Sequence, residues 1–256
     1  METKKITAQT VRADFNDLVA VVHYTKAAHA LGLWASEHTL IQRFFPDLQS
    51  PLLEAGCGAG RVTLGLWQIG YRHITAFDFA EELLDQARSL AIERAATAIT
   101  FVHADATQLT ESPAFPNQRF GGALFMFNGL MQIPGRENRR SALRELHRVC
   151  SPAAPFLFTT HDRDATPTER ALWRLEKLRW ARGEQNPRLL EFGDRYFQDE
   201  AGRTFMHLPD REEVLADLAA TGWQPTFDMM RTELSREKPA VHEFSDNCRF
   251  WAAERI

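Results

Sequence analysis

Short apolar runs alternate with amphipathic helical segments along the middle of the chain. The runs, which are apolar or β-branched, are 52–54, 73–77, 99–103, 122–127 and 155–160. Uninterrupted runs of this kind are typical of strands that are buried on both faces. Between them, residues 61–69, 80–94 and 136–149 have apolar positions at helical spacing. This alternation predicts a doubly wound α/β fold, with helices on both faces of a mostly parallel sheet.

The pattern changes at both ends of this region. Residues 12–45 predict one or two helices. Their apolar positions are Leu18, Val22, Leu31, Trp34, Leu40 and Phe44. Beyond residue 160, an amphipathic helix is predicted over 167–182 and a pair of β runs with a glycine-containing turn over 196–208.

The C-terminal region completes the expected sheet. Asp210 and Glu213 are spaced as a capping box that opens a helix, and Gly222 is placed to end it. Residues 223–230 and 248–255 then predict two antiparallel strands, which brings the sheet to seven with an antiparallel last strand. We expect one domain over 1–256, with a helical lid at 1–48 and a cap inserted at 164–208 between strands five and six.

Composition adds mainly exclusions. With 44% hydrophobic and 25% charged residues the chain is typical of soluble globular proteins, and a net charge of -4 offers no general attraction to nucleic acid or an anionic membrane. Three separated cysteines argue against both a disulfide framework and a structural zinc site. The apolar stretch at 120–133 is too short to span a bilayer, which takes about 20 residues. We therefore expect a cytoplasmic protein that binds no metal, membrane or nucleic acid.

The helix expected over 136–149 also contains a basic series. Arg139, Arg140, Arg144 and Arg148 lie on one expected helix, but two glutamates are interleaved with them. This arrangement favours a solvated helix face over a nucleic-acid site.

The candidate chemistry begins at a glycine-rich turn, "EAGCGAG" at 54–60, directly after the first expected strand. In an open α/β sheet, ligands bind outside the carboxyl ends of the strands, beside strand one. A dinucleotide fingerprint counted from Gly56 would need glycine at position 61, where the chain has Arg61. Read as acidic-x-G-x-G-x-G, the turn resembles the first motif of the class I S-adenosylmethionine-dependent methyltransferases, which makes an NAD-linked oxidoreductase the weaker interpretation.

The resemblance implies a set of cofactor-binding residues at successive strand ends. In that family the glycine turn holds the amino-acid end of S-adenosylmethionine, an acidic residue after strand two takes the ribose hydroxyls, and an acidic residue after strand three meets the adenine. The implied residues here are Glu54, Gly56, Cys57, Gly58, Gly60, Asp78, Phe79, Asp105, Ala106 and Asn128. The turn before strand five departs from the family, since its usual glycine pair is Ala153 and Ala154.

Each of these residues also has a simpler interpretation. Glu54 can pair at a strand end, and Cys57 is better explained as a small packed side chain than as a nucleophile. Asp78 can cap the following helix, and Asp105 can satisfy loop backbone donors.

The acceptor side is less defined. His161 follows strand five and is a candidate general base, although it could equally satisfy a loop carbonyl. Tyr24, beside His23 in the expected lid, and Tyr196 and His207 in the expected cap are, with His161, candidate substrate-binding residues. Methyl transfer does not require a catalytic side chain, because the sulfonium is already a strong electrophile.

The resemblance therefore predicts methyl transfer from S-adenosylmethionine, leaving S-adenosylhomocysteine, to a small-molecule acceptor. The expected cap favours a small acceptor, with O- or N-methylation preferred over C-methylation. The alternatives are an RNA or protein methyltransferase and a nonenzymatic cofactor- or partner-binding protein on the same fold. The sequence leaves the acceptor and the oligomeric state open.

Overall fold

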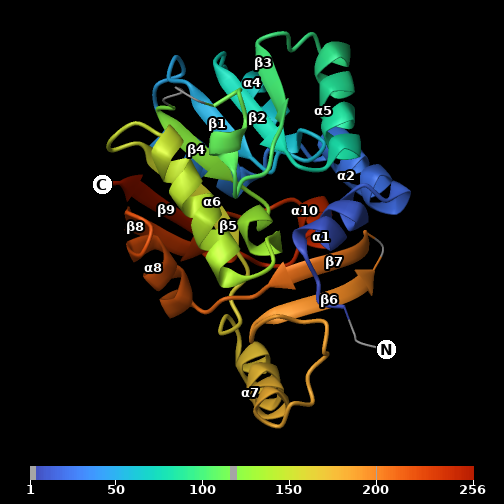
Figure 1. Cartoon of the computed structure of the whole chain (residues 1–256). Coiled ribbons are helices and arrows are strands. Elements are labelled where there is room, and N and C mark those ends of the chain that lie inside the picture. Colours follow the sequence, from blue (N-terminus) through green and yellow to red (C-terminus); the bar gives the residue numbers. More distant parts are fainter. Residues whose placement is uncertain (1–3, 116–119, 200) are drawn as a thin grey trace.

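A seven-stranded sheet forms the centre of the molecule (Figure 1). The computed structural model describes residues 4–115, 120–199 and 201–256. The strand order is β3-β2-β1-β4-β5-β9-β8. The strands are β1 (Leu52–Ala55), β2 (Ile74–Asp78), β3 (Ile99–His103), β4 (Gly122–Phe125), β5 (Pro155–Thr160), β8 (Trp223–Met230) and β9 (Arg249–Arg255). Strand β9 runs antiparallel to both of its neighbours, which confirms the expected fold class.

Helices cover both faces of the sheet. They are α1 (Ala8–Phe15), α2 (Leu18–Ala30), α3 (Ala35–Phe44), α4 (Arg61–Gln68), α5 (Glu81–Glu93), α6 (Arg136–Val149), α7 (Pro167–Ala181), α8 (Arg211–Ala219), α9 (Arg231–Leu234) and α10 (Pro239–Phe244), with short 3-10 turns η1 (Leu109–Glu111) and η2 (Gly129–Gln132). Leu53 packs in one hydrophobic cluster with residues of α6 and α8, and its neighbour Leu52 packs in another with residues of α3 and α4. Burial on both faces explains why these strands have uninterrupted apolar sequences.

The chain changes direction in the sheet beside β1. Strands β2 and β3 lie to one side of β1, whereas β4 and β5 lie to the other. Such a switch point leaves a crevice at the carboxyl ends of the central strands, which is where α/β folds bind ligands. The loop after β1 lies at this place.

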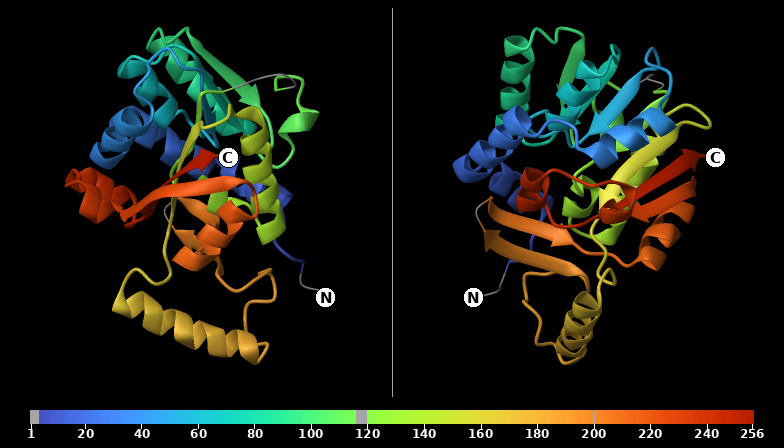
Figure 2. Two further views of the ribbon diagram at one scale, coloured as in Figure 1. Left: turned by 90° about the vertical axis from the view of Figure 1, so that its left-hand side faces the viewer. Right: turned by 180° about the vertical axis from the view of Figure 1, so that it is seen from behind.

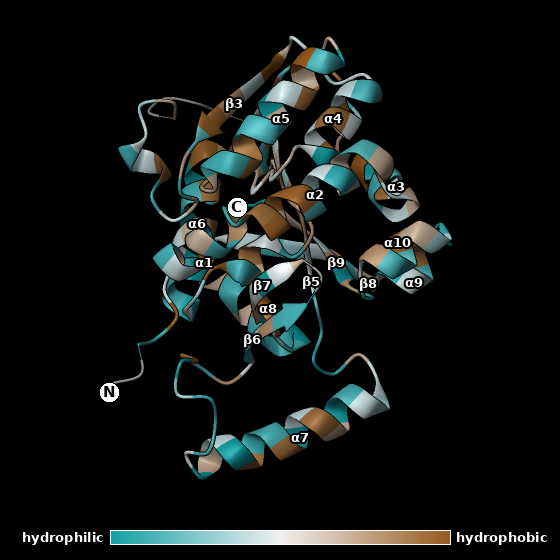
Figure 3. Ribbon diagram, turned by 90° about the vertical axis from the view of Figure 1, so that its right-hand side faces the viewer, coloured by the Kyte–Doolittle hydropathy of each residue, from teal (hydrophilic) through white to brown (hydrophobic). Residues whose placement is uncertain are grey.

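The segment between β5 and α8 contains α7 and the hairpin of β6 (Asp194–Asp199) and β7 (Gly202–His207). All views show α7 projecting away from the sheet, while the hairpin lies beside α1 (Figures 1 and 2). Figure 3 shows both polar and apolar residues along α7, and three of its leucines, Leu172, Leu175 and Leu178, are exposed. Residues 1–3 of the expected lid and residue 200 of the expected cap lie outside the described residues.

The structure differs from the sequence interpretation in three details, which are the number of N-terminal helices, the exposure of two of their apolar residues and the capping box of α8. The N-terminal region forms three helices, and Leu18 and Val22 are 74% and 42% exposed because α2 buries its alanine-rich face instead. Asp210 does cap α8, but the Glu213 side chain bonds His207 and Arg163 and so forms no capping box.

Within the described chain, no helix is both long and apolar enough to cross a bilayer.

The arginine series on α6 differs from the expected solvated face at one position. Arg139 is 1% exposed and pairs with Glu191 at 2.9 Å and with Glu213 at 3.4 Å. Arg140 and Arg144 are themselves nearer the surface and pair with Asp217 and Glu137. Because each of these guanidinium groups has a carboxylate partner, the series does not form a free basic stripe.

Candidate functional site

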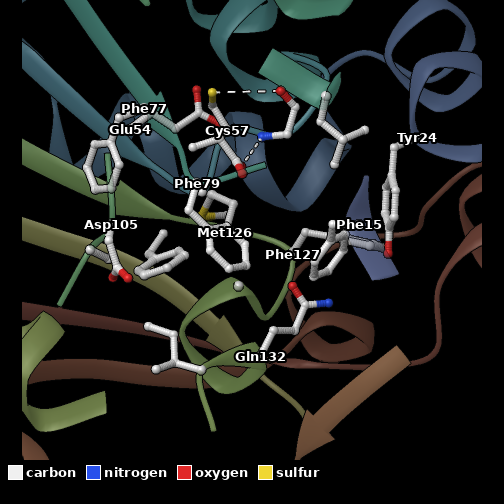
Figure 4. Close-up of a pocket in the computed structure, with 18 of the residues that line it drawn as sticks. Phe15, Tyr24, Glu54, Cys57, Phe77, Phe79, Asp105, Met126, Phe127 and Gln132 are labelled. Atoms are coloured by element: carbon white, nitrogen blue, oxygen red, sulfur yellow. Dashed lines mark hydrogen bonds between the residues drawn. The ribbon is translucent and has the colours of Figure 1, made fainter. Parts of the chain in front are cut away.

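A cavity of about 310 Å³ lies at the carboxyl ends of β1 to β4 (Figure 4). Eight of the ten residues expected to bind the cofactor line it: Glu54, Gly56, Cys57, Gly58, Asp78, Phe79, Asp105 and Ala106. Gly60 and Asn128 do not line it. The structure thus brings together residues from three separate strand ends, as the strand-end pattern predicts, and their roles toward a ligand stay proposals.

The loop after β1 depends on glycine for two different reasons. Gly56 and Gly58 both have positive φ, at 61° and 50°. A Cβ on Gly56 would lie 2.5 Å from Cε2 of Phe125, whereas a Cβ on Gly58 would meet nothing within 4 Å. Because Gly58 lines the cavity, the space beside it is the open cavity itself. Gly56 therefore allows the loop to pack, and Gly58 leaves room for a ligand.

Asp78 ties the end of β2 to this loop. Its Oδ2 accepts the backbone N–H of Gly58 at 2.7 Å, and its Oδ1 accepts that of Ala80 at 2.8 Å. Burial raises the pKa of the Asp78 carboxyl, and the two N–H donors offset part of that effect. The bond to Ala80 resembles the helix-capping role that the sequence left open. Each oxygen keeps a second lone pair, so the carboxylate can still accept hydrogen bonds from a ligand.

Glu54 is buried at the end of β1. The hydroxyl of Thr63 on α4 donates a hydrogen bond to it. Burial raises the pKa of Glu54 to about 8, against the smaller opposing effects of Thr63 and Arg61. A carboxyl group in this state gains a proton at neutral pH unless a positive charge is placed beside it. The group is thus suited to a cationic ligand.

Asp105 satisfies its own loop and also faces the cavity. Its Oδ1 accepts hydrogen bonds from the backbone N–H of Thr107 at 2.8 Å and from the Thr107 hydroxyl at 2.7 Å. This is the simpler role that the sequence left open. These two hydrogen bonds fix the direction of the Asp105 carboxylate, which also lines the cavity.

Arg61, the residue that breaks the dinucleotide fingerprint, has a structural role. Its guanidinium binds the Glu37 carboxylate through two nitrogens, at 2.7 and 2.6 Å, and donates to the carbonyl of Gly32 at 2.8 Å. It also lies over the Trp34 ring, 4.4 Å from the centroid. Its charge therefore anchors α3 to α4, and although Arg61 also lines the cavity, Glu37 compensates that charge.

Gly60 and Asn128 are positioned beside the cavity without lining it. Gly60 is the N-cap residue of α4, and a Cβ there would lie 3.0 Å from that of Ala87. Asn128 has a φ of 59° and follows Phe127 with a φ of 53°. Two successive non-glycine residues in the left-handed region are strained, which is typical of functional loops.

His161 supports this strained loop. Its Nε2 lies 3.2 Å from the amide Nδ2 of Asn128, and its Nδ1 lies 3.3 Å from the carbonyl of Asn247. Burial lowers the pKa of His161, which favours the neutral ring. With Nδ1 donating to the carbonyl, Nε2 accepts from the asparagine amide, so its lone pair is not available to a substrate. His161 is also absent from the cavity lining, which argues against the general base considered from the sequence.

Tyr24 lines the cavity, but Tyr196 and His207 do not. The Tyr196 hydroxyl donates to Asp14 Oδ2 at 2.8 Å. His207 is fully buried, with Asp194 at 2.9 Å on Nδ1 and Glu213 at 2.8 Å on Nε2. These two carboxylates raise the pKa of His207 against the opposing effect of burial. Tyr196 and His207 therefore hold the hairpin in place rather than contact a ligand in the cavity.

Several cavity residues were not anticipated from the sequence. They are Phe15, Phe127, Gln132 and Phe244. Phe244 lies on the short helix α10, for which Pro239 at the first turn was an available signal. Phe127 ends the expected strand 122–127, directly before Asn128, which was also an available signal, whereas Phe15 and Gln132 depend on how distant segments meet.

Comparison with known proteins gives a family for the central region. Residues 52–153 match the family described as a methyltransferase domain. A malonyl-[acyl-carrier protein] O-methyltransferase of Erwinia billingiae (strain Eb661) is 30% identical over 123 residues, which are 48% of this chain and 43% of that protein. The match thus spans less than half the length of this curated relative.

Solved structures share the fold over the whole chain. The 1,6-didemethyltoxoflavin-N1-methyltransferase of Burkholderia thailandensis has a TM-score of 0.64 at 17% identity, covering 100% of this chain and 93% of that one. The [4+2]-cyclase SpnF has a TM-score of 0.68 at 17% identity, covering 100% and 99%. At such identities the likeness shows the fold alone, and SpnF illustrates that one fold supports different reactions.

Proposed function

Since residues 52–153 are a methyltransferase domain, in a chain with the class I S-adenosylmethionine-dependent methyltransferase fold, we propose that the protein transfers a methyl group from S-adenosylmethionine to a small-molecule acceptor. The observation that carries the proposal is the convergence of Glu54, Asp78 and Asp105 on one cavity beside the Gly58 turn. An RNA or protein acceptor and a nonenzymatic binding role are the alternatives.

The charge of the cavity favours this cofactor over NAD. Three acidic side chains line it, and Arg61, which lines it too, is neutralised by Glu37. At neutral pH S-adenosylmethionine has a sulfonium, an ammonium and a carboxylate and therefore a net positive charge, which an acidic cavity attracts, whereas the diphosphate of NAD would be repelled. In this proposal the ammonium binds beside Glu54, the ribose hydroxyls bind Asp78 and the adenine lies near Asp105.

In the proposed reaction, S-adenosylmethionine supplies a methyl carbon to which the acceptor's lone pair bonds while the carbon–sulfur electron pair remains with sulfur. The protein's contribution is to orient the two molecules in line and to exclude water. Tyr24, Phe127 and Phe15 supply apolar walls for this purpose. A neutral acceptor has a proton to lose after transfer, and His161 is not placed to take it, because its Nε2 is engaged by Asn128.

Contacts between two segments outside residues 52–153, one of which contributes Ala8 and Phe15 to the cavity wall, support a small acceptor. The N-terminal segment is joined to the 164–208 segment by the Ile6 N–H to the Arg188 carbonyl at 3.0 Å and by Lys5 Nζ to the Leu189 carbonyl at 2.6 Å. Ile6, Val11 and Phe205 pack together in the same place. We propose that these segments act as the lid and cap expected from the sequence and restrict entry to small molecules.

The test is a methyl-transfer assay with radiolabelled S-adenosylmethionine and the purified chain. Libraries of small phenols, amines and heterocycles form one arm, and total RNA and denatured protein form the others. Label transfer to a small molecule that is lost in Asp78→Ala supports the proposal. Transfer to RNA or protein alone would overturn the acceptor class, and cofactor binding without transfer to any acceptor would favour a binding protein.

A further inference from the structure

The cavity has an aromatic half whose walls come largely from outside the methyltransferase domain. Phe15 lies at the end of α1, Tyr24 on α2 and Phe244 at the end of α10, all outside residues 52–153. Phe127, within that range, lies between them. Since the expected cofactor residues lie within 52–153, the part of the cavity built by other segments is where acceptor specificity would arise.

The four rings form a continuous wall. Phe127 stacks on Phe244 with centroids 5.2 Å apart and planes at 25°, and it meets Tyr24 edge-on at 6.2 Å. Tyr24 in turn lies 5.7 Å from Phe15. Figure 4 shows Phe15, Tyr24 and Phe127 grouped on the side of the cavity opposite Glu54 and Asp105. Because Phe244 stacks on both Phe127 and His23, faces of these rings are already occupied, and a bound aromatic ring meets mainly their edges.

The position of Phe127 is fixed by the backbone and its supports. Its left-handed φ of 53° is followed by Asn128, whose backbone N–H donates to the Thr159 hydroxyl at 2.8 Å. Behind the ring, Trp34 makes an edge contact at 5.6 Å. A strained residue held from both sides presents a rigid ring, and rigid aromatic surfaces bind flat ligands at low entropic cost.

The polar groups of this half are uncharged. Gln132 lines the cavity near the Tyr24 side chain. Burial raises the pKa of Tyr24, so its hydroxyl stays protonated. Among the described residues on the cavity wall, Arg61 is the cationic one, and Glu37 already neutralises it. An acceptor with a carboxylate would therefore find acidic neighbours and no compensating cation.

We propose that the methyl acceptor is a planar aromatic or heteroaromatic molecule without a negative charge. Its ring lies against Phe127, Phe244, Tyr24 and Phe15, and a hydroxyl or amino substituent is oriented by Gln132. This inference rests on the proposed methyltransferase function and specifies its substrate class. It also sets this site apart from one built for a malonyl carboxylate.

The test measures binding of defined probes in the presence of saturating S-adenosylhomocysteine. 6-Hydroxyquinoline is the aromatic probe, cyclohexanol the saturated-ring probe and hexanoate the anionic probe, each titrated by calorimetry into wild type, Phe244→Leu and Phe197→Leu. Phe197 is 42% exposed on β6 and does not line the cavity, so its variant is the matched control. Circular dichroism and melting curves show whether each variant is folded.

The expected result is that 6-hydroxyquinoline binds most tightly to wild type and that Phe244→Leu weakens it about 3- to 10-fold. The control should bind as wild type does, and the S-adenosylhomocysteine Kd should change less than about twofold in both variants. Equal or tighter binding of cyclohexanol or hexanoate would overturn the inference, as would an unchanged probe affinity in a folded Phe244→Leu. Absence of S-adenosylhomocysteine binding to wild type would instead refute the proposed function.

Discussion

The hydroxyl of Tyr196 donates a 2.8 Å hydrogen bond to the carboxylate of Asp14, which is 4% exposed. The two residues are far apart in sequence, on β6 and α1. Arg203 of β7 approaches the same carboxylate at 3.2 Å. The hairpin is thereby fastened to the helix that ends in Phe15, a wall of the cavity. Through this contact we expect Tyr196 to influence the site without reaching it.

Tyr196→Phe should loosen this contact. Removing the donor leaves a buried carboxylate with one fewer partner, which costs about 1–2 kcal/mol and should lower the Tm by a few degrees. The acceptor KM should rise while the S-adenosylmethionine Kd stays constant. Tyr71→Phe is the matched control, because the Tyr71 hydroxyl bonds the Phe45 carbonyl and the residue does not line the cavity. If both variants changed the acceptor KM equally, the role given to Tyr196 would be wrong.

Alanine at the two glycines of the first loop should have different effects. Gly58→Ala should cost about 1 kcal/mol of stability, because φ is 50° but the new Cβ meets nothing within 4 Å. Its methyl group would occupy the cavity, so we expect cofactor affinity to fall at least about tenfold. Gly56→Ala should destabilise the fold much more, since its Cβ would lie 2.5 Å from Phe125. Thermal melts with and without cofactor distinguish the two effects, and a Gly58→Ala protein with normal affinity would contradict this account.

The buried carboxyl of Glu54 makes stability depend on pH. Its folded pKa of about 8 lies above its ordinary value of 4.5, so the folded state keeps a proton that the unfolded chain releases. Its contribution to the free energy of unfolding therefore falls as pH rises between about 4.5 and 8. Glu54→Gln should lack this part of the decline. Urea unfolding of wild type and Glu54→Gln at pH 5 and pH 8 measures this decline in the free energy of unfolding. Equal declines in the two proteins would show that Glu54 is not responsible.

Glu54 should also link cofactor binding to proton release. An ammonium beside the carboxyl lowers its pKa, so below pH 8 binding of S-adenosylmethionine should release protons. Calorimetry in buffers of different ionisation enthalpy measures the number of protons released on binding, and this number should be smaller in Glu54→Gln.

Much of the fold could be predicted from the sequence because the features that determine it are local in the chain. Strands buried on both faces need uninterrupted apolar runs, and the carboxyl ends of parallel strands meet, so Glu54, Asp78 and Asp105 could be grouped in advance. The environments of individual side chains could not be predicted from the sequence. Arg139 and His207 are charge-bearing residues that became buried because carboxylates from other elements meet them. The aromatic wall likewise requires three segments to converge, which no periodicity in one segment encodes.

The central claim, that the acidic cavity binds S-adenosylmethionine, is tested most directly by ligand-induced thermal shifts. Wild type, Asp78→Ala and the exposed helix control Asp85→Ala are melted with S-adenosylmethionine, S-adenosylhomocysteine, NAD or no ligand. A ligand at 100 times its Kd adds about 2.7 kcal/mol to the stability of the protein that binds it. We predict that the two adenosyl compounds raise the Tm of wild type and Asp85→Ala but not of a folded Asp78→Ala, and that NAD has no effect. A shift with NAD and none with the adenosyl compounds would contradict the account.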